Sequence, residues 1–279
     1  MTFLSFANSG PIWRAAVCTW SAILLLVLSA GELHAQGRTI SLAVNAGSGD
    51  SNNIYNTQDI YHPFASMLSK ALNVRVEAKP LLASLVKSSI YGNRYPLLLV
   101  HTNDAAEAIK SKRYKVIGFS QDLGNNRILF FARKGSTATK LADIAGRCVV
   151  ATDSFAAATA VAIMKKKNLF DNLRSYTFVR EGDALEFHLK TNFCEIAILR
   201  SDAGAQKLVA AGHRQIHASA EFPVFVLLAD KKLGQGAIEK LRKLMVEFQP
   251  DANSAFMKET GIVTFDTDQA DALELFNLY

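Results

Sequence analysis

Short apolar runs rich in β-branched residues alternate with helical patterns along most of the chain. The clearest helical pattern has Pro63 in its first turn and five apolar residues on one face: Phe64, Met67, Leu68, Ala71 and Leu72. The run 96–100 is apolar throughout and bounded by turn residues, as is typical of a central parallel strand buried on both faces. This alternation predicts parallel sheets covered by helices.

The pattern divides into two series. In the first, strands are predicted at 39–44, 74–78, 96–100, 115–120 and 128–133. Gly135-Ser136-Thr137 interrupts it, and a second series follows with strands at 148–152, 176–179 and 196–199. After a further strand that begins at Pro223, the rest of the chain is predicted to be helical. We therefore expect an α/β fold of two lobes, with lobe 1 formed by 36–133 and 224–279 and lobe 2 by 134–223.

The first 35 residues have the layout of a secretory signal. Arg14 is the only charge before the apolar run 22–28, and small residues follow that run. The run is about half of the ~20 residues that a bilayer crossing needs. Cleavage is expected near Ala35, which would release a soluble protein into the periplasm. An uncleaved signal that anchors the chain in the membrane is the alternative.

The formal net charge of +6 narrows the choice of ligand or partner only slightly. A basic protein outside the cytoplasm suits an anionic ligand or an anionic membrane surface. The basic residues are dispersed along the chain, which argues against nucleic acid as a partner.

Two cysteines remain after removal of the signal, Cys148 and Cys194, and two are too few for a disulfide scaffold. Either one disulfide, which an oxidising compartment would permit, or two buried thiols fits the pattern. Two thiols are the interpretation favoured from the sequence.

Candidate binding residues follow the predicted strands at their carboxyl ends, where ligands of parallel α/β sheets bind. The strongest candidate for a binding segment is Thr152-Asp153-Ser154-Phe155. Free backbone N–H groups at a helix start, the positive end of the helix dipole and two hydroxyls together make an anion site. An ordinary helix cap is the alternative interpretation of this segment.

Four further candidates lie at other strand ends. Asn45 follows the first strand. His101 and Thr102 follow the buried run 96–100 and can donate hydrogen bonds to a ligand, or else form a polar turn. Arg200 ends a strand of the second series and can pair with an anion in a bidentate manner, or else be a solvated surface arginine.

The sequence lacks the usual signatures of an enzyme. It contains no G-x-S-x-G elbow, no H-E-x-x-H and no Cys/His ligand spacing, and its six histidines are scattered. We therefore expect no catalytic residue, no metal site and no cofactor. A periplasmic hydrolase whose residues converge only in space is the less favoured alternative.

Four short stretches carry a family resemblance: Tyr61-His62-Pro63-Phe64, 141–147 leading into Cys148-Val149-Val150, Asp153-Ser154, and 221–226. They resemble the phosphate, phosphite and phosphonate-binding proteins of ABC importers, which are type II periplasmic binding proteins. The resemblance implies two doubly wound lobes joined by a two-strand hinge, with crossings near 133–136 and 221–223.

The same resemblance implies a function. The chain would be a monomeric receptor that closes on a small anionic, phosphonate-like solute and passes it to a membrane permease. Tyr61 would be a ligand-facing aromatic residue and Ser154 an anion contact. The family's run of hydroxyls after this serine is replaced here by Phe155 and three alanines. A solute-sensing partner of a membrane receptor or sensor kinase is the rival with the same fold.

Overall fold

The computed structural model describes residues 39–45, 51–124, 126–152, 154–200, 203–269 and 271–277. The expected signal segment 1–35 and its cleavage site lie outside these residues, as does Asp153. No helix in the described ranges is long and apolar enough to cross a bilayer.

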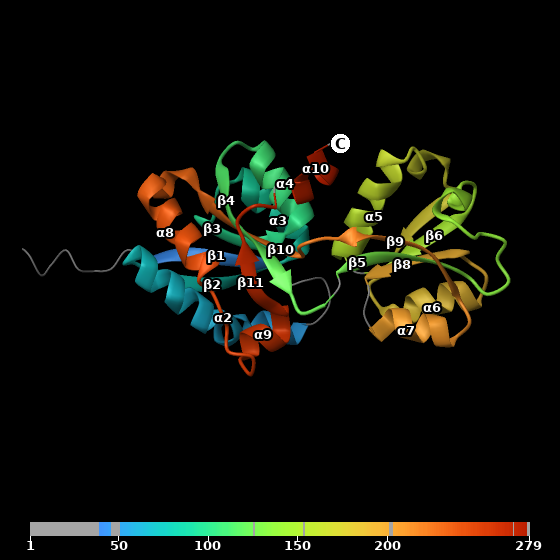
Figure 1. Ribbon diagram of the computed structural model, residues 1–279, viewed down its shortest axis with the longest axis horizontal. Coiled ribbons are helices and arrows are strands. Elements are labelled where there is room, and N and C mark those ends of the chain that lie inside the picture. Colours follow the sequence, from blue (N-terminus) through green and yellow to red (C-terminus); the bar gives the residue numbers. More distant parts are fainter. Residues whose placement is uncertain are drawn as a thin grey trace, which may run out of the picture. The chain divides into compact units, whose positions relative to one another are not determined.

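Two separate sheets organise the chain (Figure 1). Sheet A has the order β11-β4-β10-β3-β1-β2. Its strands are β1 (Thr39–Asn45), β2 (Arg75–Leu81), β3 (Leu97–His101), β4 (Tyr114–Asp122), β10 (Phe225–Asp230) and β11 (Ile262–Asp266). Strand β1 is parallel to β2 and β3, whereas β10 is antiparallel to β3 and β4.

Sheet B has the order β7-β6-β8-β5-β9. Its strands are β5 (Arg127–Ala132), β6 (Cys148–Ala151), β7 (Ser175–Phe178), β8 (Ile196–Arg200) and β9 (Arg214–Glu221). Strand β6 is parallel to β7 and β8, and β5 is antiparallel to β8 and β9. The prediction of an α/β fold with two sheets is confirmed.

Helices cover both faces of each sheet (Figure 1). Around sheet A lie α2 (Ser51–Leu72), α3 (Ala83–Tyr91), α4 (Thr102–Lys110), α8 (Gln235–Val246), α9 (Ala255–Thr260) and α10 (Asp271–Asn277). Around sheet B lie α5 (Ser154–Lys166), α6 (Gly182–Lys190) and α7 (Ala203–Ala210). Short 3-10 turns occur at η1 (Leu141–Ile144), η2 (Phe170–Asn172) and η3 (Lys231–Leu233).

The core of sheet A explains why its central strand was recognisable. Leu97 and Leu99 of β3 face the cluster under α2, α8 and α9, whereas Leu98 and Val100 face the cluster under α3 and α4. All four side chains are fully buried. A strand covered on both faces needs a continuous apolar run, which is what the sequence shows at 96–100.

The position of β5 differs from the prediction. We assigned 128–133 to the end of lobe 1, but β5 pairs with β8 and β9 in sheet B. The segment Arg133–Ser136 is a tight turn, in which Ser136 N donates to Arg133 O at 2.9 Å and Gly135 has φ 81°. The glycine therefore marks a turn at the end of a strand. The chain passes from β4 to β5 at 123–126, and returns from β9 to β10 at 222–224.

Three further elements differ from the pattern. Helix α2 begins at Ser51, so Pro63 lies inside it, because the buried face of this long helix continues upstream through Tyr61 and Thr57. Strands β9 and β11 were not predicted; both are edge strands of mixed polarity, without the apolar run of a central strand.

The interpretation of the cysteines as free thiols is wrong. Cys148 and Cys194 form a disulfide, with their Cα atoms 4.7 Å apart. Cys148 opens β6 and Cys194 lies two residues before β8. Because β6 and β8 are parallel neighbours, their amino-terminal ends lie side by side, within the range of Cα distances that a disulfide spans.

Candidate functional site

With the exception of Tyr61, the predicted binding residues lie at or just beyond the carboxyl ends of strands in both sheets. Asn45 ends β1 and His101 ends β3 in sheet A. In sheet B, α5 starts at Ser154 shortly after β6, and Arg200 ends β8. This edge of a parallel sheet is where loops and helix starts converge on a ligand.

The sheet A half contains a compact cluster of polar side chains, which we call the amide–carboxylate cluster: Asn45, His101, Asn103 and Asp104. Asn45 Nδ2 lies 3.3 Å from His101 Nδ1 and 3.4 Å from Asp104 Oδ2. Asn103 Nδ2 donates to Asp104 Oδ1 at 3.2 Å. Asn45 and His101 are buried, so the cluster is built into the strand ends.

Asp104 makes this half of the site negative at neutral pH. Burial, and then the charge of Glu107, raise the pKa of its carboxyl to about 6, and the hydrogen bond from Asn45 offsets part of this rise. The carboxylate is therefore mostly ionised at pH 7 and protonated below about pH 6.

Thr102 is hydrogen-bonded to 222–224, the second segment that connects the two sheets. Its side chain is fully buried, and its hydroxyl donates to Pro223 O. Its backbone N donates to Val224 O at 3.1 Å. The structure thus uses Thr102 to fasten the start of α4, and a contact between its hydroxyl and a ligand stays a prediction.

Tyr61 lies in the core beneath sheet A. Its ring packs edge-on against Phe256 of α9 at 5.6 Å, and burial raises the pKa of its hydroxyl above the usual range. The structure places Tyr61 in the packed interior and does not bring it into the amide–carboxylate cluster. The suggested role as a ligand-facing aromatic stays a prediction.

In the sheet B half, α5 begins with Ser154, which is half-buried, and Phe155, which is fully buried. The Phe155 ring lies 5.6 Å from the ring of His101, centroid to centroid, and the His101 ring lies 5.1 Å from that of Phe225. His101 and Phe155 therefore bring the two halves of the candidate site into contact.

Arg200 ends β8 at the edge of sheet B at which α5 begins. Ala151 pairs with Ile198 across the parallel strands β6 and β8, so the segments that continue from both strands lie at the same edge of sheet B. Arg200 is half-buried there, and its charge lowers the pKa of Asp122. A helix start beside an arginine is an arrangement that binds anions.

Asp122 links the two crossings and was not predicted from the sequence. Its Oδ2 accepts from Asn126 Nδ2 at 2.7 Å in the first crossing and from Val224 N at 3.4 Å in the second. Burial raises the pKa of its carboxyl to about 6, although the hydrogen bonds and Arg200 lower it in part.

Asp104 was also missed as a site residue, because an acid shortly after a strand is more often a helix cap than a ligand contact. In the structure, His101 occupies the N-cap position of α4, and its side chain makes no capping hydrogen bond within the described part of the chain. The available signal was an acid two residues after the candidate site residue Thr102. Among the described residues, no group of three or more His, Cys, Asp or Glu side chains could hold a metal ion.

Comparison with known proteins gives one family. The family model described as the periplasmic substrate-binding protein of a phosphonate ABC transporter matches residues 52–273. No curated protein matches the chain with significant similarity.

Solved structures show the same fold at low identity. XAC2383 of Xanthomonas citri, solved with ATP, is 12% identical, with a TM-score of 0.67 over 86% of this chain and 95% of that one. PhnD1 of Prochlorococcus marinus, in complex with methylphosphonate, is 11% identical, with a TM-score of 0.60 over 85% and 94%. The periplasmic aliphatic sulphonate binding protein SsuA of Escherichia coli is 9% identical, with a TM-score of 0.52 over 86% and 89%.

Proposed function

The chain belongs to the family of periplasmic substrate-binding proteins of phosphonate ABC transporters, and on this premise we propose that it captures a small anionic solute for a membrane permease. The family is one of receptors and not of enzymes, and its members act in the periplasm. Cleavage of a signal near Ala35 and a monomeric receptor are part of the proposal.

The observation that carries the proposal is the positive edge of sheet B. The register of β6 and β8 sets the start of α5 and Arg200 at the same edge of sheet B, where we expect backbone N–H groups, the Ser154 hydroxyl and a guanidinium to meet the anion. Each of these groups is a hydrogen-bond donor to an anion, and the helix dipole adds to their attraction.

The amide–carboxylate cluster favours an anion that carries an organic substituent over a simple inorganic ion. Asn45 and His101 can hydrogen-bond to a substituent of the anion, while the rings of Phe155 and Phe225 beside His101 offer an apolar wall. One similar structure was solved with methylphosphonate, and another is named for aliphatic sulphonates. Both ligands have an anionic head group on a small organic group. We infer the same ligand class for this chain.

The lobes of this receptor would follow the two sheets. Lobe 1 is then 39–122 and 225–277, lobe 2 is 127–221, and the hinge is formed by the crossings at 123–126 and 222–224. Closure of the lobes on the solute would bring the two carboxyl edges together. Asp122, hydrogen-bonded to both crossings, would hold the hinge strands in register.

A thermal-shift screen of the chain from residue 36 onward tests the proposal. The panel contains methylphosphonate, phosphate and ethanesulfonate, with arginine as a cationic control. A ligand that binds only the folded state stabilises it by about 2.7 kcal/mol at a hundredfold excess over Kd. We expect the melting temperature to rise with at least one anion and not with arginine. A folded protein that responds to none of the anions, or only to arginine, would contradict the proposal.

A further inference from the structure

Strand β9 is an exposed edge of sheet B. In the described part of the chain, it pairs with β5 on one side and with no strand on the other. The charged residues Arg214 and Glu221 stand at its two ends. The six residues between them carry no charge at pH 7, because burial and the nearby Lys167 lower the pKa of His217. An edge of this kind presents unpaired backbone groups that a further strand can bind.

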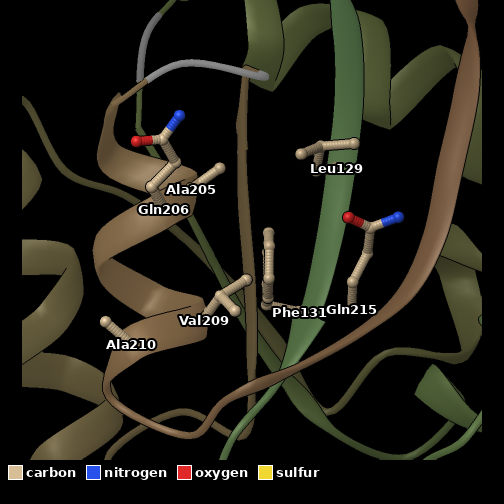
Figure 2. A pocket seen from close by; sticks show the side chains of 7 residues that line it. All are labelled: Leu129, Phe131, Ala205, Gln206, Val209, Ala210 and Gln215. Carbon is tan, nitrogen blue, oxygen red and sulfur yellow. The ribbon is translucent and has the colours of Figure 1, made fainter.

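An apolar groove runs along β9 on the face that carries α7, and we call it the α7 groove. Figure 2 shows the side chains of α7 on one side of it and Leu129, Phe131 and Gln215 on the other. Its volume is about 520 Å³. Val209 is 59% exposed at its wall, a large value for an apolar side chain inside a concave site.

A second groove of about 520 Å³ runs along the same strand on the opposite face, which carries η1. We call it the η1 groove. Its lining is Lys140, Leu141, Ala142, Lys167, Leu169, Ile216 and His217. Gln215 thus lines one groove, whereas Ile216 and His217 both line the other, because the register of β9 against β5 shifts between Phe130 and Phe131. A strand added to β9 would send alternate side chains to these two faces.

Lysines surround the grooves. Lys140 and Lys167 line the η1 groove. The Lys134 side chain lies against Gly212, two residues before β9, and Lys207 is exposed on α7 next to Gln206 of the α7 groove. Glu186 is an acid near Lys207, and its pKa is lowered mainly by Lys190 and in part by Lys207, so the positive charge of this edge comes mainly from Lys134, Lys140 and Lys167. This charge repels a second copy of the basic chain and attracts an acidic segment.

We propose that β9 is a docking strand for an extended segment of another protein, a segment that is apolar in its middle and acidic at its ends. The segment adds to sheet B by main-chain hydrogen bonds to β9. Its alternate side chains enter the α7 groove and the η1 groove, and its acidic ends lie near the lysines. This mode of recognition takes affinity from the backbone and specificity from the side-chain grooves.

The docking strand is separate from the candidate solute site. The candidate solute site lies at the carboxyl ends of β6 and β8 and of strands in sheet A, whereas the two grooves lie along β5 and β9, at the other edge of sheet B from β7. The inference therefore does not depend on which solute the protein binds, and each site can be tested while the other is intact.

Fluorescence polarisation with labelled ten-residue peptides tests the proposal on the chain from residue 36 onward. The peptides share a central Val-Thr-Val-Thr-Val-Thr and differ in having two Glu, two Ser or two Lys at each end. We expect the Glu-flanked peptide to bind roughly tenfold more tightly than the Lys-flanked one, with the preference falling as salt rises. Hydrogen exchange at 215–220 should slow when the Glu-flanked peptide is bound.

Matched variants locate the binding. Val209→Asp should abolish peptide binding, while Val246→Asp on α8, where the valine is 63% exposed, should leave it unchanged. The double change Lys140→Glu with Lys167→Glu should remove the preference for the acidic peptide, whereas Lys240→Glu with Lys243→Glu, also on exposed positions of α8, should not. The lysine variants keep the test valid if Val209→Asp fails to fold.

Three results would overturn the proposal. The first is the absence of binding by every peptide, and the second is equal binding of the Glu-flanked and Lys-flanked peptides. The third is a dimer in size-exclusion chromatography with light scattering that dissociates in Val209→Asp, because this edge would then hold a second copy of the chain.

Discussion

The two halves of the candidate site have the same position in their sheets and opposite electrostatic character. The sheet A half is buried and holds the carboxylate of Asp104 among the amides of Asn45 and Asn103. The sheet B half contains the start of α5, and we expect the guanidinium of Arg200 at the same edge. A common topology therefore fixes where a ligand binds, while the side chains of each half decide which part of the ligand it receives. We infer that the anionic group binds at the sheet B half.

The halves also differ in how their sheets are held. Sheet B is cross-linked by Cys148–Cys194, which joins positions 46 residues apart, and no disulfide joins strands of sheet A in the described residues. The double variant Cys148→Ser with Cys194→Ser should lose about 2–5 kcal/mol of unfolding free energy. Anion affinity well below the melting temperature should stay the same, because the disulfide lies at the amino ends of β6 and β8, opposite the site.

Urea unfolding of the variant, with and without a reducing agent, measures this loss. The wild-type protein should shift towards the variant once it is reduced, and the variant should not respond to reduction. An unchanged unfolding midpoint would show that the disulfide does not hold sheet B together.

Removal of the positive charge from the sheet B half should weaken anion binding strongly. A hydrogen bond to a charged group contributes about 1.5–3 kcal/mol, so Arg200→Ala should raise the Kd for the anion by roughly 10- to 100-fold. Calorimetric titration measures this change. Arg174→Ala, at an exposed position just before β7, is the control and should bind as the wild type does. Equal affinities in the two variants would remove Arg200 from the site.

The hydroxyl at the start of α5 should matter less than the guanidinium. A neutral hydrogen bond contributes about 0.5–1.5 kcal/mol, so Ser154→Ala should raise the Kd by up to about tenfold. Ser88→Ala, whose exposed hydroxyl donates to Leu85 O, is the matched control. A loss for Ser154→Ala as large as that for Arg200→Ala would mean that the helix start, and not the arginine, is the main anion contact.

The carboxylate of the sheet A half should give a small pH dependence. Because the pKa of Asp104 is about 6, its negative charge repels an anion at pH 7.5 and is largely neutralised at pH 5. Affinity should therefore rise as the pH falls through about 6, by roughly threefold. Ethanesulfonate is the suitable probe, since its own charge stays constant over this range.

Asp104→Asn separates this effect from other titrations. The variant should bind ethanesulfonate more tightly than the wild type at pH 7.5, and the rise in affinity on acidification should be smaller. An affinity that falls on acidification in the wild type but not in the variant would show that the carboxylate attracts the ligand, for example through a cationic substituent.

Much of the site's framework could be predicted from the sequence. The apolar run before His101 predicts the end of a strand, and the helical pattern after β6 predicts the start of a helix. Both could be recognised because these signals are local. The site roles of Asp104 and Asp122 could not be predicted in this way. Whether an acid after a strand caps a helix or faces a neighbouring strand depends on which strand lies next to it, and the pattern along the chain does not contain that information.

The assignment of β5 failed for the same physical reason. Gly135-Ser136-Thr137 looked like a boundary between lobes, but a glycine with positive φ serves equally well in a tight turn at a strand end. One of the two strands that β5 pairs with, β9, was itself not predicted, because edge strands need no continuous apolar face. Pairing over about 90 residues of sequence, as in Arg127 with Glu221, has no local signal.

The most direct test of the account is a calorimetric titration with one anion, methylphosphonate or the best ligand of the thermal-shift screen, on three proteins at pH 7.5. The wild type should bind one equivalent, Arg200→Ala should bind more weakly, and Asp104→Asn should bind more tightly. Opposite signs in the two variants would establish that the sheet B half holds the anion and the sheet A half opposes its charge. Weakening in both variants, or no change in either, would contradict this division of the site.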